Sequence, residues 1–285
     1  MMREAIPEDA AAMEAFLSGH PESSMFLRGN LMAHGIGERV APHGTRFFLW
    51  MGRDGIAGVF GLTNNGYLMC QVPGHEAGAY AAFAFAIAGE TVAGMTGVAD
   101  QVAATLAALG LRAEDCALHH DEPLCRLDLS RLDAPTERLR PSGPDDEALL
   151  RSWFRSYLRD TGIASDNAAA ADQADARAQD AARDGSIHLL EENGHPIAMA
   201  AINARVADMV QVGGVFVPQE QRNRGLGRRI TAALLASERD RGARSAILFA
   251  NNPAADRAYS ALGFERVGDY RIALLPAPVR IGVLA

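Results

Sequence analysis

The sequence contains no lysine, so all 27 of its basic residues are arginines. This absence excludes a Schiff-base lysine and the lysine of a Walker-type phosphate loop, and it leaves cationic chemistry to arginine. Cysteine is also scarce, and Cys70, Cys116 and Cys125 lie far apart in apolar surroundings. Because they are odd in number and widely spaced, we predict reduced core thiols and neither a disulfide framework nor a zinc site. We therefore expect a cytoplasmic protein.

Long hydrophobic runs are missing as well. The longest, 77–88, is interrupted by Gly78 and is well short of the roughly 18 residues that a membrane span needs. The first ten residues are charged from Arg3 onward and lack the apolar core of a signal peptide. A net charge of −8 argues against a nucleic-acid partner, because phosphate binding draws on a concentrated basic surface. We expect no membrane and no nucleic acid.

What the chain does contain is a concealed duplication. Three short patterns recur in the same order, displaced by 137, 145 and 153 residues. Conserved order with slowly growing spacing indicates two copies of one architecture, the second with insertions. The matching pairs are Arg3–Asp9 with Arg140–Asp146, Val72–Pro73 with Val217–Pro218, and Ala108–Leu111 with Ala261–Phe264. Pro135, Pro141 and Pro144 punctuate the stretch between the copies, so we predict domains at 1–135 and 136–285.

Each copy alternates strands and helices, which predicts an α/β fold with a mixed sheet. In the first copy we expect strands at 46–51, 56–62 and 67–72 and helices at 75–87 and 100–109. In the second we expect helices at 145–159, 225–241 and 253–262, and strands at 187–191, 196–206, 209–217, 245–250 and 267–275. The segment 164–185 consists mostly of Ala, Asp, Gln and Arg, which predicts a weak helix with little apolar face. Its aspartates favour a solvated surface over an acidic lid for a cationic substrate.

The stretch Val212–Arg229 predicts a strand, a short loop and a helix. Gly213 and Gly214 inside the strand indicate a bulge or a close backbone approach. In the loop, Gly225 and Gly227 allow a ligand to approach the backbone, and the first-turn N–H groups of the helix lack intrahelical partners. Such a turn binds phosphate. A Rossmann dinucleotide turn is disfavoured because the third glycine of that pattern is absent.

A second pattern follows one helix and one strand later. It reads N-x-x-A-x-x-x-Y-x-x-x-G-F, with Asn252, Ala255, Tyr259, Gly263 and Phe264. Together with the R-x-x-G-x-G pattern at Arg222, Gly225 and Gly227, it makes residues 138–275 resemble the GCN5-related N-acetyltransferase (GNAT) superfamily. The resemblance implies two tandem GNAT-like acyl-CoA N-acyltransferase folds, with acetyl-CoA (coenzyme A) as the cofactor.

The resemblance also implies the site. The pantetheine arm is expected to pair with the backbone of Val215, Phe216 and Val217, and Asn252 to hydrogen-bond that arm. The pyrophosphate is expected at the loop and helix start formed by Arg222, Asn223, Arg224, Gly225, Leu226, Gly227 and Arg228. A backbone N–H would polarise the thioester carbonyl, and Tyr259 would protonate the departing thiolate. Acetyl transfer would be direct, to a primary amine of a small molecule, amino acid or peptide.

Several alternatives stay open. Asn252 can be a helix cap, and Tyr259 can be a packed helix residue with a hydrogen-bonded tip. The chain can also be a non-catalytic acyl-CoA-sensing module, or a transferase for a longer acyl-CoA. The general base is not identifiable, because a chain of waters serves as well as Asp208, Glu220, His188 or Glu191. No metal is expected at His119–His120, and the protein can be a monomer or a homodimer.

The first copy departs from the family pattern at every functional position. Under the displacements given above, the motif residues of the second copy correspond in the first to Ala77, Tyr80, Ala82, Ala99 and Leu106. We therefore predict that residues 1–135 form a degenerate GNAT-like domain that does not bind the cofactor. It would support the other domain or wall its substrate cleft.

Overall fold

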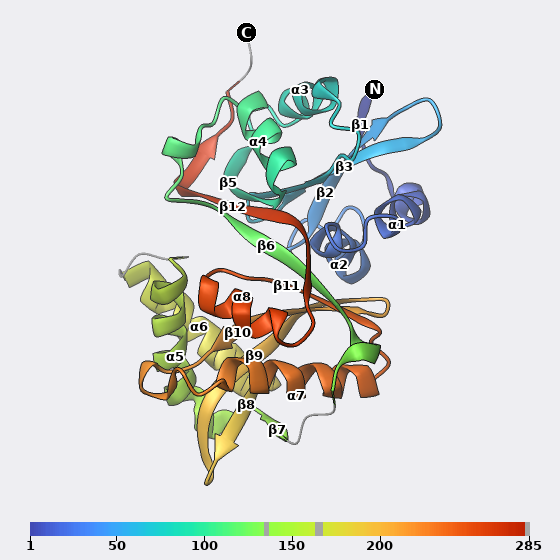
Figure 1. Ribbon diagram of the computed structural model, residues 1–285. Helices are drawn as coiled ribbons and strands as arrows, with labels where there is room; N and C mark the ends of the chain where they lie inside the picture. Colours follow the sequence, from blue (N-terminus) through green and yellow to red (C-terminus); the bar gives the residue numbers. More distant parts are fainter. Residues whose placement is uncertain (134–136, 163–167, 283–285) are drawn as a thin grey trace. The chain divides into compact units, whose positions relative to one another are not determined.

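A computed structural model describes residues 1–133, 137–162 and 168–282. The chain forms two compact units (Figure 1). Unit 1 contains residues 1–122 and the C-terminal segment from Gly268, and unit 2 contains Pro123–Val267. These boundaries differ from the predicted 1–135 and 136–285. None of the described helices is long and apolar enough to span a membrane.

The boundaries differ because each unit takes its last strand from the other half of the sequence. Strand β12 (Glu265–Arg280) follows the second copy, yet it pairs antiparallel with β5 (Thr91–Val98) in unit 1. Strand β6 (Leu118–Asp128) ends the first copy, yet residues 124–128 pair antiparallel with β11 (Ser245–Phe249) in unit 2. A hydrophobic pattern identifies a strand, but the pairing partner is decided by tertiary contacts.

Unit 1 has the strand order β1-β2-β3-β4-β5-β12. The remaining bounds are β1 Met2–Glu4, β2 Thr45–Met51, β3 Ile56–Thr63, β4 Tyr67–Gln71, α1 Ala10–Ser18, α2 Met25–His34, α3 Ala77–Ala86 and α4 Ala99–Ala108. Successive residues of β2 point to opposite faces of the sheet and pack in different cores, because side chains alternate along a strand. Phe47 and Leu49 pack with α1 and α2, whereas Phe48 packs with α3 and α4.

Unit 2 has the strand order β6-β11-β10-β9-β8-β7. Its other bounds are β7 Leu139–Pro141, β8 Ile187–Glu192, β9 His195–Val206, β10 Met209–Phe216, α5 Glu147–Thr161, α6 Ala168–Asp184, α7 Leu226–Asp240 and α8 Pro253–Ser260. One face packs on α7 and α8 through Val210 and Leu248, and the other packs on α5 and α6 through Leu189 and Met199. Strands β8, β9 and β10 are antiparallel neighbours.

Helix α6 has more of an apolar face than its composition predicts. Ala174, Ala178 and Ala181 recur on one side and are buried against α5 and the sheet. Asp172 and Asp180 are exposed, whereas Asp175 is half-buried and pairs with Arg155 of α5 at 2.9 Å. This arrangement agrees with the solvated-surface interpretation of the acidic segment, of which 163–167 lie outside the described residues.

The repeated Arg–Asp pattern forms the same structure in both units. Arg3 forms a bidentate pair with Asp9, with both N–O distances at 2.6 Å, and Asp9 also accepts a hydrogen bond from the Ile6 N–H. In unit 2, Arg140 binds Asp146 at 2.6 and 2.9 Å, and Asp146 accepts from the Gly143 N–H. The duplication therefore extends from the sequence to a local hydrogen-bonded arrangement.

Candidate functional site

Strands β10 and β11 are paired at one end and apart at the other. They run parallel from Met209–Ser245 to Gln211–Ile247, and among the described residues the pairing stops there although β10 continues to Phe216. The register between β10 and β9 shifts between Gly213 and Phe216, and Gly214 has a φ of 60°. The two glycines thus form the irregularity that the sequence predicts. Beyond it, the β11 side of the β10 backbone has lost its strand partner.

The turn after β10 is held by Arg222. Its Nε donates to the carbonyl oxygen of Val217 at 3.1 Å, and a terminal nitrogen pairs with Asp160 at 2.5 Å. The guanidinium also lies 6.0 Å from the centre of the Phe216 ring. The Val217 N–H, in contrast, has no hydrogen-bond partner among the described residues. Arg222 therefore fixes the shape of the turn, and part of its charge is compensated by Asp160.

The loop leading into α7 presents backbone N–H groups. Asn223 and Gly225 both have left-handed backbones, with φ of 64° and 71°, and no side chain caps the first turn of α7. Because the first N–H groups of a helix have no intrahelical acceptor, this turn attracts an anion. A Cβ on Gly227 would approach Val215 and Val217 only to 3.9 Å. Gly227 thus leaves space beside the splayed strand, whereas Gly225 is required by its backbone angle.

The arginines around the turn differ in how they are engaged. Arg224 pairs with Glu192 at 2.6 Å, and Arg229 pairs with Glu137 at 2.6 Å and with Glu192 at 3.0 Å. These carboxylates raise the pKa of Arg229, and the arginines lower the pKa of Glu192. The exposed Arg228 forms no ion pair with any residue that the structure describes. Arg228 is therefore the basic side chain of the motif that is available to a ligand.

Helix α8 begins at Pro253, as predicted, and Asn252 is its N-cap. The Oδ1 atom of Asn252 accepts from the N–H groups of Ala254 and Ala255 at 3.0 and 2.9 Å, and Nδ2 donates to Asn251 at 2.8 Å. Pro253 stands at the first helical position, where its missing N–H costs nothing. The helix-cap interpretation of Asn252 is confirmed, and its carboxamide oxygen is already used.

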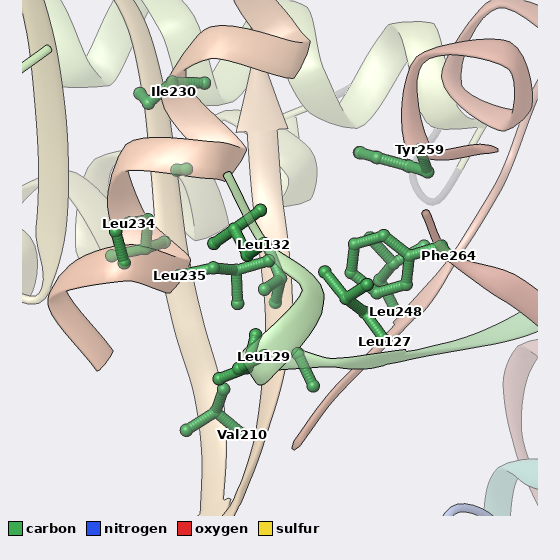
Figure 2. Close-up of a cluster of buried hydrophobic side chains, with 14 of the residues drawn as sticks. Leu127, Leu129, Leu132, Val210, Ile230, Leu234, Leu235, Leu248, Tyr259 and Phe264 are labelled. Atoms are coloured by element: carbon green, nitrogen blue, oxygen red, sulfur yellow. The ribbon is translucent and has the colours of Figure 1, made fainter. Parts of the chain in front are cut away.

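Tyr259 is largely buried between α8 and α7. Its side chain is 8% exposed and its ring lies 6.0 Å from that of Phe264. Figure 2 shows Tyr259 and Phe264 in the cluster that also contains Ile230 and Leu248. The ring is thus held by packing, on the side of the sheet that carries the start of α7.

Comparison with known proteins identifies this arrangement. The profile of the acetyltransferase (GNAT) family matches residues 148–264. The chain carries a GNAT acetyltransferase domain. No curated protein sequence matches the chain.

Solved structures resemble the fold over nearly the whole chain. A GCN5-related N-acetyltransferase from Kribbella flavida is 19% identical with a TM-score of 0.54, covering 89% of this chain and 94% of that one. One from Sphaerobacter thermophilus is 16% identical with a TM-score of 0.52, covering 100% and 97%. A Drosophila protein is 13% identical with a TM-score of 0.59, covering 96% and 98%. At such low sequence identities, the structural similarity establishes only that the fold is shared.

Two of the four candidate bases of the GNAT domain, Asp208 and Glu191, form ion pairs with arginines. Asp208 lies in the β9–β10 turn, at the far end of β10, near Arg244 at 3.8 Å. Glu191 pairs with Arg140 at 2.8 Å. Burial and the charge of Arg241 lower the pKa of His188, which lies on the same face of β8 as Leu190 and so faces α7. Glu220 lies in the turn that follows β10, and it stays a candidate.

Unit 1 has a splayed strand pair of its own, which a side chain closes. Strands β4 and β5 are parallel only at Tyr67–Gly94 and Leu68–Met95. Beyond these pairs the Val72 N–H donates to Oε1 of Gln101 at 2.7 Å, and Gln101 is only 3% exposed. Val72 is the residue that matches Val217 in the duplication. Sequence reasoning missed Gln101, because a glutamine in an Ala-rich helix carries no signal of what it contacts.

The start of α3 also differs from the start of α7. The helix follows Glu76, and Ala77, Tyr80 and Ala82 lie inside it, where unit 2 has its arginine and two glycines. An acid at a helix N-terminus satisfies the positive end of the helix and repels phosphate. Among the described residues no group of His, Cys, Asp and Glu is arranged to hold a metal ion.

Proposed function

We propose that the GNAT domain transfers an acetyl group from acetyl-CoA to a primary amine of a small molecule, amino acid or peptide. The proposal is supported above all by one combination. The Val217 N–H has no partner in the described part of the chain, and it stands next to an uncapped helix start with room beside Gly227. A peptide-like arm bearing a phosphate at one end complements both features.

Different residues of the motif would bind the cofactor and assist the reaction. The N–H groups of Leu226, Gly227 and Arg228 would hold the pyrophosphate, with Arg228 adding charge. The backbone of Val215, Phe216 and Val217 would pair with the arm as a missing strand does. Acetyl-CoA supplies the acetyl group as a thioester, whose thiolate is a good leaving group. A backbone N–H of the splayed segment would stabilise negative charge on the acyl oxygen, and Tyr259 would hold the proton that the sulfur receives.

We further propose that unit 1 binds no cofactor. Its matching N–H is already satisfied by Gln101, and its helix start carries Glu76 in place of the glycine turn. Since Cys70, Cys116 and Cys125 are all free thiols, we also propose a reducing, cytoplasmic setting.

The deciding experiment is a thiol-release assay with acetyl-CoA and a panel of primary amines, run beside calorimetric binding of acetyl-CoA. We expect amine-dependent release. Micromolar binding without turnover on any amine would favour an acyl-CoA-sensing module instead. Faster turnover with longer acyl-CoAs would keep the mechanism and change the donor.

A further inference from the structure

One residue of β9 is displaced toward the splayed part of β10. Gln211 pairs with Ala204 and Val212 pairs with Ile202, so Asn203 between them has no partner on β10. A bulge of this kind re-aims a side chain. A Cβ built on Gly213 would lie 2.0 Å from Nδ2 of Asn203 and 2.6 Å from its Cγ. The carboxamide of Asn203 therefore occupies the space that a side chain at position 213 would take.

The sheet register decides on which face this carboxamide lies. Val210 and Val212 pack in the core with α7. Gln211 and Gly213 alternate with them and so point to the other face. The pyrophosphate would bind at the start of α7, so the arm would reach the splay from that side. An acceptor then has to approach from the face that carries Asn203.

Two neutral amides line this face beside the splay. Asn203 is exposed, and its side chain forms no hydrogen bond with any described residue. Gln211 is 2% exposed, and its Nε2 donates to the Val212 carbonyl oxygen at 2.8 Å while its Oε1 has no partner within the described chain. The neighbouring sheet positions on the same face carry no carboxylate; they are Met199, Ala201, Met209, Gly213, Ser245, Ile247 and Phe249. Carboxylates near this region come from other elements: Asp160 of α5, the helix that packs on this face, is paired with Arg222, and Glu220 lies in the turn after β10.

Amides in place of carboxylates at these described sheet positions restrict the acceptor. A carboxamide oxygen accepts a hydrogen bond from a neutral amine but cannot take a proton from an ammonium group. An α-amino group has a pKa of about 7.7–8.0 and a lysine amine about 10.4, so at about pH 7.5 the neutral fraction of the α-amino group is roughly 300-fold larger. A site lined by amides binds only the neutral amine, so the larger neutral fraction of the α-amino group makes it the preferred acceptor.

We propose that Asn203 binds the acceptor nitrogen and that the site selects weakly basic amines, of the α-amino type, over lysine-type amines. The inference rests on the proposed acetyl transfer. The lone pair of the neutral amine forms the C–N bond, and the C–S electrons leave with the sulfur, which takes a proton from Tyr259. The surplus proton of the nitrogen passes to water, and a proton from water restores the Tyr259 hydroxyl.

The test uses the full chain and two acceptors, a lysine-free peptide with a free α-amino group and an Nα-blocked lysine peptide. At about pH 7.5 we expect kcat/KM for the first to exceed the second by at least 100-fold, narrowing to roughly tenfold at about pH 9.5 as lysine deprotonates. Equal rates at pH 7.5 would overturn the selectivity. Acetyl-CoA binding without turnover on either peptide, or on the wider amine panel, would instead overturn the proposed function itself.

Asn203→Ala tests the residue. Its KM for the α-amino peptide should rise about five- to tenfold, as for the loss of one hydrogen bond, while the Kd of acetyl-CoA stays within about twofold. An unchanged KM would contradict the assignment. Asn203→Asp keeps the shape beside Gly213 and adds a carboxylate, and it should raise kcat/KM for the lysine peptide about tenfold relative to the α-amino peptide. Asp208→Asn, at the far end of the same hairpin, is the matched control. It should change neither the KM for the α-amino peptide nor the ratio of kcat/KM between the two peptides.

Discussion

The Val72 N–H donates to Oε1 of Gln101 at 2.7 Å, whereas the N–H of Val217, its counterpart in the duplication, has no partner among the described residues. In both units two parallel strands splay apart at the same point. The units differ in the group that accepts a hydrogen bond from the backbone N–H exposed there. In unit 1 the acceptor is the side-chain amide oxygen of Gln101, a residue of the same unit. In unit 2 the N–H group is available to the amide of a ligand.

The first prediction concerns the number of cofactor sites. Calorimetry should give one acetyl-CoA per chain, and Gln101→Ala should leave that number unchanged, because unit 1 also lacks the glycine turn. The variant should lower the free energy of unfolding of unit 1 by about 1–3 kcal/mol, since the buried Val72 N–H loses its acceptor. Urea denaturation measures this change. Two sites per wild-type chain would contradict the closed-site interpretation.

The motifs could be predicted from the sequence because each needs particular residues at fixed spacing. Gly225 provides a left-handed backbone angle, and Asn252 with Pro253 provides a helix start, so the sequence alone locates both. The strand exchange could not be predicted, since β12 has the pattern of an ordinary strand whichever sheet it joins, and the sequence pattern predicts no strand over β6. Asn203 was missed for a related reason, because only the register with β10 reveals the bulge that re-aims it.

The second prediction concerns Gly225, whose φ of 71° is unfavourable for other residues. Gly225→Ala should lower stability by about 1–2 kcal/mol and weaken acetyl-CoA binding severalfold, because the first-turn N–H groups of α7 would be displaced. Gly268→Ala is the matched control. Gly268 has no positive φ, and a Cβ there meets nothing within 4 Å. Equal cofactor affinity in the two variants would show that the turn does not hold the phosphate.

The third prediction uses the repeated Arg–Asp pair. Hydrogen bonds from Arg3 and from the Ile6 N–H lower the pKa of Asp9 from 3.8 to about 2. A depressed carboxyl pKa contributes stability above about pH 4, and this contribution is lost as the pH falls toward about 2. Asp9→Asn should therefore be less stable than the wild type at neutral pH, with a gap that closes between about pH 4 and 2. A gap that persists in acid, measured by urea denaturation, would assign the loss to something other than charge.

The last prediction concerns Tyr259, whose ring is fixed by packing against Phe264 while its hydroxyl is the proposed acid. Tyr259→Phe keeps the ring, so stability and the Kd of acetyl-CoA should change little. Loss of a general acid should lower kcat about 100-fold, and the loss should shrink with a donor whose thiol leaves more readily. Tyr259→Leu separates packing from chemistry, because it should lower both stability and kcat. Turnover of Tyr259→Phe at the wild-type rate across the pH range would leave the hydroxyl with a structural role only.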